Sequence, residues 1–332
     1  MYKERVPCEI CSKPTTEFNY GVICCNACKM FYRRAKLATN FPKECQNPGN
    51  CKGCRFCRFQ RCLQAGLSRE IVAPPRQLNS TLGAVVENLK ALDIYRKDQF
   101  LKYTPLGDLS IEELILTDTS NLIKKPDDFQ QGNHQWIMTN HITSVNALKK
   151  FTFFKDLSDT EKMLFVTQSH IAYGMLTFAM RSFTNRSLRN EYPGGIDIFS
   201  NELKNFYRNS PKSLNECRGQ VLRKLWELNI RDEEFLLLCA IIACNPGPSN
   251  FSDFTRALLS RHQNEYASIL MKFCQQTYQS ASPARFMEIV CVRLTINKAF
   301  EDLKKVVIPF QLSKPKFEKA KILEESLETL MK

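Results

Sequence analysis

The sequence predicts a small, cysteine-rich helical module followed by a larger all-α domain of many helices. Ten of its 15 cysteines lie in the first 62 residues, mostly in pairs separated by two residues. Beyond residue 83, apolar residues recur at intervals of three and four, as on the buried face of a helix. Residues 68–82 contain Pro74-Pro75 and few bulky apolar side chains, which is typical of a hinge. We therefore expect domains at residues 1–67 and 83–332.

The positive charge of the chain is concentrated in the cysteine-rich part. The 332 residues carry a net charge of +13. Residues 1–76 hold 14 Lys/Arg and 5 Asp/Glu, whereas the remainder holds 33 and 29. A basic head on a nearly balanced body predicts that the head binds nucleic acid. A solvated basic surface is the plainer alternative, but it leaves the cysteines unexplained.

The first four-cysteine group has the spacing of a zinc site. Cys8 and Cys11 form one pair, and Cys25 and Cys28 form a second pair thirteen residues later. Four thiolates at this spacing suit a closed, tetrahedral zinc, and a zinc of this kind drives the folding of a small module. An odd cysteine total in such pairs favours metal over disulfides, and Cys24 is left as an ordinary thiol.

A helix is expected directly after this zinc site, over about residues 26–37. Lys29, Arg33 and Lys36 fall on one face at helical spacing, and this basic face is expected to enter the major groove of DNA. Arg34 is better placed for phosphate. Apolar side chains remain for packing inward, namely Phe31, Tyr32 and Ala35. The alternative is a zinc module whose solvated charges serve protein partners, as in RING or LIM domains.

The decapeptide CNACKMFYRR at residues 25–34 resembles the DNA-reading helix of the nuclear hormone receptor family, in the variant common among nematode receptors. Tyr32 replaces the second Phe of the usual pattern. The resemblance implies that base edges are read by Asn26, Ala27, Lys29 and Met30. Asn26 and Ala27 stand where the best-known receptors have Glu-Gly, so the resemblance implies no particular half-site.

A second zinc site is implied by the same resemblance. Its ligands would be Cys45, Cys51, Cys54 and Cys57, followed by a supporting helix that begins at about Arg58. Only two residues separate Cys51 from Cys54, where the family has about nine, but cysteines at this spacing can still wrap one metal. Two structural zinc ions are therefore expected. An iron–sulfur cluster is the alternative for this dense run, and it would leave the basic helix unexplained.

Helical patterns follow one another along the larger domain. The first is marked by Val85, Leu89, Leu92 and Phe100. The others lie near residues 111–125, 134–152, 159–183, 200–208, 213–230, 232–244, 251–275, 283–305 and 316–331. Breakers separate several of them, at Pro126, Pro193-Gly194-Gly195, Pro211, 245–248 and Pro309. About ten helices in an all-α domain are the simple interpretation.

The larger domain is similar to the ligand-binding domain of the same family. Residues 147–166, ALKKFTFFKDLSDTEKMLFV, share the register of the family's body signature. The resemblance places Lys149 where the family has the lysine that grips coactivator helices. Glu325, in the stretch ILEESLETLM at 322–331, would be the other end of this charge clamp. The alternatives are a solvated lysine and a terminal helix that only caps the fold.

The resemblance implies a sequence-specific DNA-binding transcription factor that regulates RNA polymerase II transcription in the nucleus. Its partners would be double-stranded DNA and transcriptional coregulators, and it allows a small lipophilic ligand and a homo- or heterodimer. The competing hypothesis is a zinc-scaffolded protein-interaction module without DNA binding. No enzyme is expected, because four-thiolate zinc sites are closed and the four histidines are scattered. No membrane segment is expected either, because the longest apolar run covers only residues 235–244.

Overall fold

The structure is a computed structural model, and it describes most of the 332 residues. The described ranges are 5–19, 22–37, 42, 44–45, 51, 53–65, 67, 80–117, 122–126, 128–187, 189–210, 213–214, 217, 219–247, 250–313 and 321–331. The chain forms two compact units. The N-terminal unit is Met1–Ala73 and the C-terminal unit is Pro74–Lys332, except that Leu225–Asn229, with the end of helix α9 (Gln220–Leu228), group with the N-terminal unit. Of the predicted hinge, residues 68–79 lie outside the described residues, and residues 80–82 already belong to a helix.

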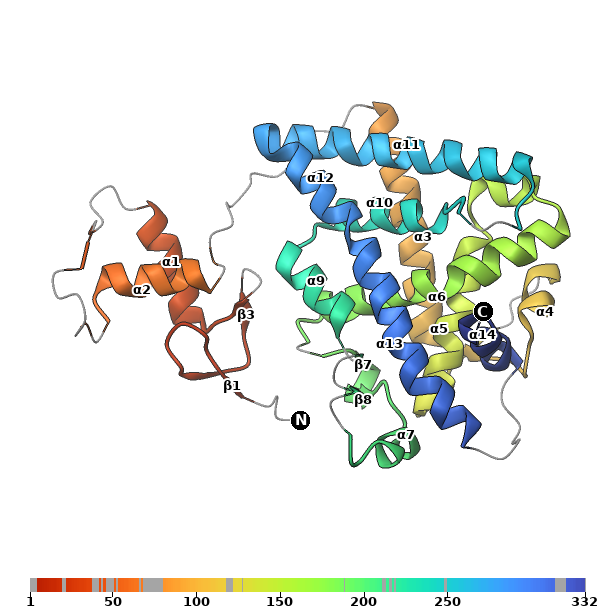
Figure 1. The fold of residues 1–332 in the computed structure, drawn as a ribbon, viewed down its shortest axis with the longest axis horizontal. Helices are drawn as coiled ribbons and strands as arrows, with labels where there is room; N and C mark the ends of the chain where they lie inside the picture. The colour runs from red at the N-terminus through yellow and green to blue at the C-terminus, as the bar shows by residue number, and fades with distance from the viewer. Residues whose placement is uncertain are drawn as a thin grey trace. The chain divides into compact units, whose positions relative to one another are not determined.

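The N-terminal unit combines two short antiparallel hairpins with two helices (Figure 1). Its elements are β1 (Val6–Pro7), β2 (Pro14–Thr15), β3 (Phe18–Asn19), β4 (Val22–Ile23), α1 (Asn26–Leu37) and α2 (Arg55–Gln64). Val6 pairs with Thr15 and Phe18 pairs with Ile23. Helix α1 has the limits that the sequence predicted. A small core is shared by the hairpins and both helices, and it includes Cys8, Cys28, Tyr32, Cys62 and Leu67.

The C-terminal unit is mostly helical. Its longer elements are α3 (Ser80–Lys102), α4 (Ile111–Leu116), α5 (Asn133–Leu148), α6 (Asp159–Thr184), α7 (Asn201–Phe206), α9 (Gln220–Leu228), α10 (Asp232–Ala243), α11 (Asp253–Tyr278), α12 (Ser282–Val290), α13 (Val292–Leu312) and α14 (Lys321–Met331). Two short antiparallel strand pairs accompany them, β5 (Tyr103–Pro105) with β6 (Leu122–Lys124) and β7 (Glu191–Tyr192) with β8 (Ile196–Asp197). The prediction of a mostly helical body is confirmed.

Local sequence explains where several helices begin. Ser158 and Ser252 accept hydrogen bonds from the backbone N–H groups three residues later, which caps α6 and α11. Ser110 and Glu113 form a capping box that starts α4. Side-chain oxygens satisfy N–H groups that would otherwise lack a partner at these helix ends.

The centre of the C-terminal unit is the apolar helix α10. Every residue from Glu234 to Ala243 is buried, and α10 packs against α3, α6 and α11. Glu234 is the one charged residue among these buried residues of α10, and its carboxylate is fully buried. It accepts hydrogen bonds from Arg285 Nε at 2.8 Å and from the Tyr278 hydroxyl at 2.8 Å. This buried ion pair ties α10 to α11 and α12.

Three local predictions are wrong. The pattern expected as one helix over residues 283–305 forms two helices, α12 and α13, which meet at Cys291. The helix expected over residues 111–125 ends at Leu116, and residues 122–124 form strand β6, because they pair with β5 in an antiparallel register. Pro309 was expected to end a helix but lies inside α13. Buried Val306 and Phe310 hold that part of α13 on the core, and Ser313 N donates to Pro309 O at 3.0 Å, which closes the last turn.

The short helix α4 lies against three longer helices of the C-terminal unit. It packs on α5, α6 and α14, and α14 lies next to it in Figure 1. Ile111, Leu114 and Ile115 are the buried residues of α4. None of the helices in the described part of the chain combines the length and apolarity that a membrane crossing requires.

Candidate functional site

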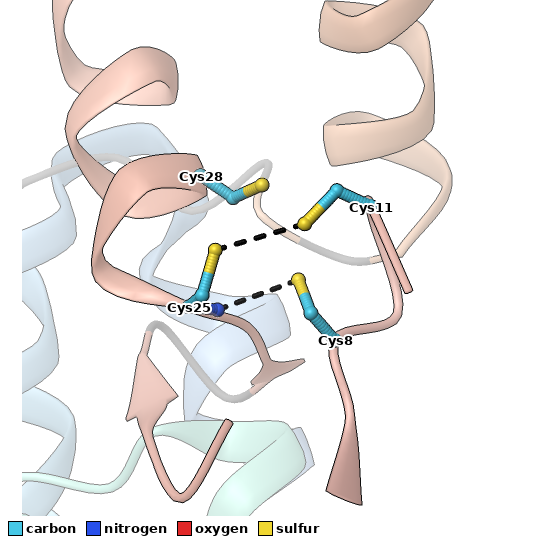
Figure 2. Close-up of side chains that lie close together, drawn as sticks. All are labelled: Cys8, Cys11, Cys25 and Cys28. Atoms are coloured by element: carbon cyan, nitrogen blue, oxygen red, sulfur yellow. Dashed lines mark hydrogen bonds between the residues drawn. The ribbon is translucent and has the colours of Figure 1, made fainter. Parts of the chain in front are cut away.

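The first four predicted zinc ligands come together at the start of α1 (Figure 2). Cys8 and Cys11 lie on the turn after β1, and Cys25 and Cys28 lie at the N-terminus of α1, with all four sulfur atoms within 4.8 Å of one another. The sulfur atoms of Cys11 and Cys25 are 3.7 Å apart, and Cys25 N donates to Cys8 Sγ at 3.4 Å. The site therefore fixes the first turn of α1.

The second four-cysteine group is also brought together, despite its short spacer. The sulfur atoms of Cys45, Cys51, Cys54 and Cys57 lie within 4.8 Å of one another at the N-terminus of α2. Cys54 is the N-cap of α2, and its Sγ accepts a hydrogen bond from Cys57 N at 3.4 Å. Hydrogen bonds from the backbone N–H groups of Cys54 and Gly53 lower the pKa of the Cys51 thiol to about 6. This lowered pKa favours the thiolate at Cys51, the form that binds zinc, whereas hydrogen bonding with Cys45 raises the pKa of Cys57 to about 12.

Both groups have the dimensions of a zinc–thiolate tetrahedron. Zinc–sulfur bonds of about 2.3 Å require sulfur atoms about 3.8 Å apart along each edge. The separations are 3.7 Å between Cys11 and Cys25 and 3.9 Å between Cys45 and Cys54. The residues therefore fit two structural zinc ions, each held by four cysteines. Four thiolates leave no open coordination position, so each ion would organise the fold rather than activate a water.

Cys24 and Cys62 lie outside both groups. Both are fully buried in the core of the N-terminal unit. Burial raises the pKa of Cys24 to about 12 and that of Cys62 to about 11, so both thiols stay protonated at neutral pH. Their role in the structure is apolar packing beside the metal ligands.

Helix α2 supports both the first zinc site and α1. Arg58 of α2 donates from Nη2 to Cys28 Sγ at 3.3 Å, and its guanidinium lies 4.4 Å from the centre of the Phe31 ring. Phe59 stacks on Tyr32 with ring centres 5.7 Å apart. The sequence identified α2 as a supporting helix but not Arg58, because a contact across thirty residues leaves no local pattern.

Helix α1 has a buried and an exposed side. Tyr32 and Ala35 are buried, as predicted. Asn26, Ala27, Met30 and Arg34 are exposed, and Lys29 is half-buried. The side chains of Arg33 and Lys36 are outside the described part of the structure. The predicted base-reading residues are thus on the side of α1 that does not face the core.

The structure places Lys149 and Glu325 at the two ends of one helix, and that helix is α4 of the chain itself. Lys149 Nζ donates to the carbonyl oxygens of Leu114 at 2.6 Å and Thr117 at 2.8 Å. Glu325 Oε2 accepts a hydrogen bond from Ile111 N at 2.5 Å. Burial raises the pKa of Glu325 despite this bond. The two residues face the helix ends that carry the opposite partial charge.

A cavity of about 700 Å³ lies inside the C-terminal unit, bounded by parts of α5, α6, α7, α13 and α14. His141 and His170 line it, together with Ser326 of α14, whose hydroxyl lies 3.2 Å from His141 Nδ1 and 3.0 Å from His170 Nε2. Burial lowers the pKa of His141 to about 3 and that of His170 to about 4. Both imidazoles are neutral at physiological pH, so neither adds charge to the cavity. The sequence shows only that the histidines are scattered along the chain, and it does not predict that two of them meet at one cavity.

Known proteins resemble the chain over nearly its whole length. A family model described as a double treble clef zinc finger of C4 type matches residues 6–69, and one described as the ligand-binding domain of nuclear hormone receptor matches residues 130–308. Three Caenorhabditis elegans relatives are nuclear hormone receptor family members nhr-197, nhr-27 and nhr-52. The first is 31% identical and covers 96% of this chain and 97% of its own. The second is 31% identical and covers 97% of this chain and 92% of its own. The third is 30% identical and covers 96% of this chain and 98% of its own. The chain belongs to the nuclear hormone receptor family.

Proposed function

We propose that the chain acts in the nucleus as a sequence-specific DNA-binding transcription factor, and that α1 is the element that reads DNA. The observation that carries this proposal is the orientation of α1. Its N-terminus is fixed by the first zinc site and its inner side by Tyr32, Ala35 and the α2 contacts. The outward residues are therefore held rigidly, as recognition of base edges requires.

Each outward residue has a role that its chemistry suits. Asn26 and Lys29 offer hydrogen-bond donors to acceptors on base edges, and Ala27 and Met30 offer apolar contact to a thymine methyl group. Arg34 provides a positive charge for the phosphate backbone, and Arg33 and Lys36 share the basic character of this helix. A protein-interaction module would have no need of this basic sequence. Family members are transcription factors rather than enzymes, which agrees with closed zinc sites.

Titration of fluorescent duplex DNA with the full chain tests this proposal. Lys29→Ala should weaken binding to a selected site by about 1–3 kcal/mol and relax base preference, because a base-edge contact is lost. Lys13→Ala is the matched control, since it removes the same charge from an exposed position outside α1. Equal weakening by both variants would show that only net charge matters, and no effect of Lys29→Ala would contradict the docking of α1.

The cavity supports a second role, binding of a small lipophilic ligand. Its volume of about 700 Å³ is in the range of ligand pockets, and the two histidines beside Ser326, His141 and His170, are neutral. Buried oxygen atoms of Asn140 and Asn190 at its wall lack a hydrogen-bond partner within the described residues. A ligand with an apolar body and a few hydroxyl or amide donors would satisfy them.

Native mass spectrometry of the chain purified from eukaryotic cells would detect such a ligand. Met175→Trp places a larger side chain in the cavity and should abolish the added mass without unfolding the protein. Leu294→Trp, at a largely exposed position, is the control. An added mass that survives Met175→Trp would place the ligand elsewhere.

Coregulator binding by Lys149 and Glu325 is also part of the proposal. Their placement at opposite ends of a short helix supports it, because this is how a charge clamp holds a helical peptide.

A further inference from the structure

Helix α4 has the amphipathic pattern of a short peptide that docks in an apolar groove. Its buried residues are Ile111, Leu114 and Ile115, at positions i, i+3 and i+4, with exposed fractions of 1%, 0% and 7%. Leu116 on the other side is 61% exposed. One apolar stripe of three large side chains is the usual way in which a helix docks in a groove.

Helices α5, α6 and α14 form the surface on which α4 packs, and we call this surface the groove. These helices supply the proposed charge clamp, since Lys149 follows the last turn of α5 and Glu325 lies in α14. Lys149 binds the C-terminal carbonyls of α4, and Glu325 binds the backbone N–H of its first residue, Ile111. Both the apolar surface and the polar ends of the groove are therefore engaged by α4.

Helix α4 is also linked to the beginning of α14. Lys321 N donates to Asp108 Oδ1 at 2.7 Å, just before α4, and Lys321 Nζ lies 3.3 Å from Glu113 Oε1. The segment that leads into α4 contains Gly107, whose φ of +79° is readily adopted only by glycine. The two Lys321 contacts thus couple the position of α4 to that of α14. Gly107, which precedes both Asp108 and α4, allows the backbone to turn there.

We infer that α4 is an internal occupant of the coregulator groove, so that a coregulator helix binds only when α4 leaves. The inference rests on the proposed coregulator role of Lys149 and Glu325. An external helix would need the same apolar surface and the same two charged groups, which cannot serve two helices at once. The chain therefore carries its own competitor for the peptide that the groove fits.

Because α4 is part of the same chain, it competes for the groove at a fixed, high effective concentration. A short linker supplies an effective concentration of about 1 mM. If the free α4 peptide bound an empty groove with a Kd of about 0.1 mM, the tethered helix would raise the apparent Kd of an equal peptide about tenfold. A change that displaces α14 would also break the Glu325 and Lys321 contacts, so it would lower this barrier.

Peptide binding to the full chain tests the inference. The probe is a fluorescent peptide with the sequence of residues 108–117, DLSIEELILT. Leu114→Asp should release α4 and lower the apparent Kd of the probe about tenfold or more. Leu116→Asp is the matched control, because the same substitution on the exposed side of α4 should leave the Kd unchanged. A folded Leu114→Asp protein with the wild-type Kd would overturn the inference.

Hydrogen exchange of the wild-type chain decides the matter even if Leu114→Asp does not fold. The amides of Ile111, Leu114 and Thr117 are hydrogen-bonded to Glu325, Ser110 and Glu113, respectively. Excess unlabelled probe should make these amides exchange faster while those of α10 stay protected. Unchanged exchange at millimolar probe would overturn the inference.

A leucine-rich coactivator peptide used in the same assay separates this inference from the coregulator proposal. Displacement of α4 by both peptides supports both. Displacement by the residue 108–117 peptide alone supports α4 as a removable occupant of the groove and refutes the coregulator role.

Discussion

Acidification should destabilise the C-terminal unit through His170, which joins α6 to α14. Its Nδ1 lies 2.9 Å from Val166 O, so it carries a hydrogen, and Nε2 lies 3.0 Å from the Ser326 hydroxyl. Because a carbonyl can only accept, the hydrogen of the neutral ring lies on Nδ1, while the Ser326 hydroxyl beside Nε2 donates to Ile322 O at 2.6 Å. A second proton would place a buried charge beside His141, whose ring centre is 5.4 Å away.

The sign and the size of the effect follow from the pKa of His170. Burial lowers this pKa from 6.5 to about 4, so the unfolded chain binds the proton more tightly than the folded chain. Stability is therefore fully present above pH 6.5 and falls as the pH drops toward 4. Between pH 7 and pH 5 the free energy of unfolding should fall by about 2 kcal/mol for this residue.

Urea unfolding followed by tryptophan fluorescence measures this loss. Trp136 of α5 reports on the C-terminal unit in a Trp226→Phe background, because Trp226 lies in the segment Leu225–Asn229 that groups with the N-terminal unit. In His170→Gln, the fall in the free energy of unfolding between pH 7 and pH 5 should be about 2 kcal/mol smaller than in the wild type. His134→Gln, at an exposed position, should leave the difference unchanged. An equal pH dependence in wild type and His170→Gln would refute the reasoning.

Three further predictions concern the zinc sites and the core. Metal analysis of the purified chain should find two zinc ions, and Cys11→Ala should leave one, because three thiolates hold the first ion poorly. Cys24→Ala should keep both ions, since Cys24 lies outside both groups; loss of an ion would make it a ligand. Arg285→Met should lower the free energy of unfolding by about 3–5 kcal/mol, because Glu234 would be left as a buried, unpaired charge. Lys102→Met breaks an exposed pair with Asp98 and should hardly move the urea midpoint; equal shifts would contradict the role of burial.

Local patterns predicted much of the fold. The limits of α1 followed from the cysteine pair at its start and the apolar spacing of Tyr32 and Ala35, and the structure reproduces them. The second zinc site had a spacer shorter than in the family, yet all four sulfur atoms meet. Cysteine spacing is informative because each pair clips the metal through a local turn.

Long-range contacts were not predictable in the same way. Residues 111–125 matched one helical pattern, and only the pairing of β5 with β6 shows where the helix ends. The spacing of Ile111, Leu114 and Ile115 was present in the sequence, but Lys149 and Glu325 lie far along the chain from it. The Ser326 contact with His170 likewise joins residues 156 positions apart. The base contacts assigned to α1 remain predictions.

In vitro selection of bound duplexes from a random DNA library is the most direct test of DNA reading by α1. The full chain loaded with zinc should enrich one short motif, and Lys29→Ala should enrich a more degenerate version of it. Removal of zinc should abolish the enrichment, because α1 would lose its fixed N-terminus. A library that stays random after repeated rounds with the zinc-loaded wild type, or an identical motif with Lys29→Ala, would contradict the account.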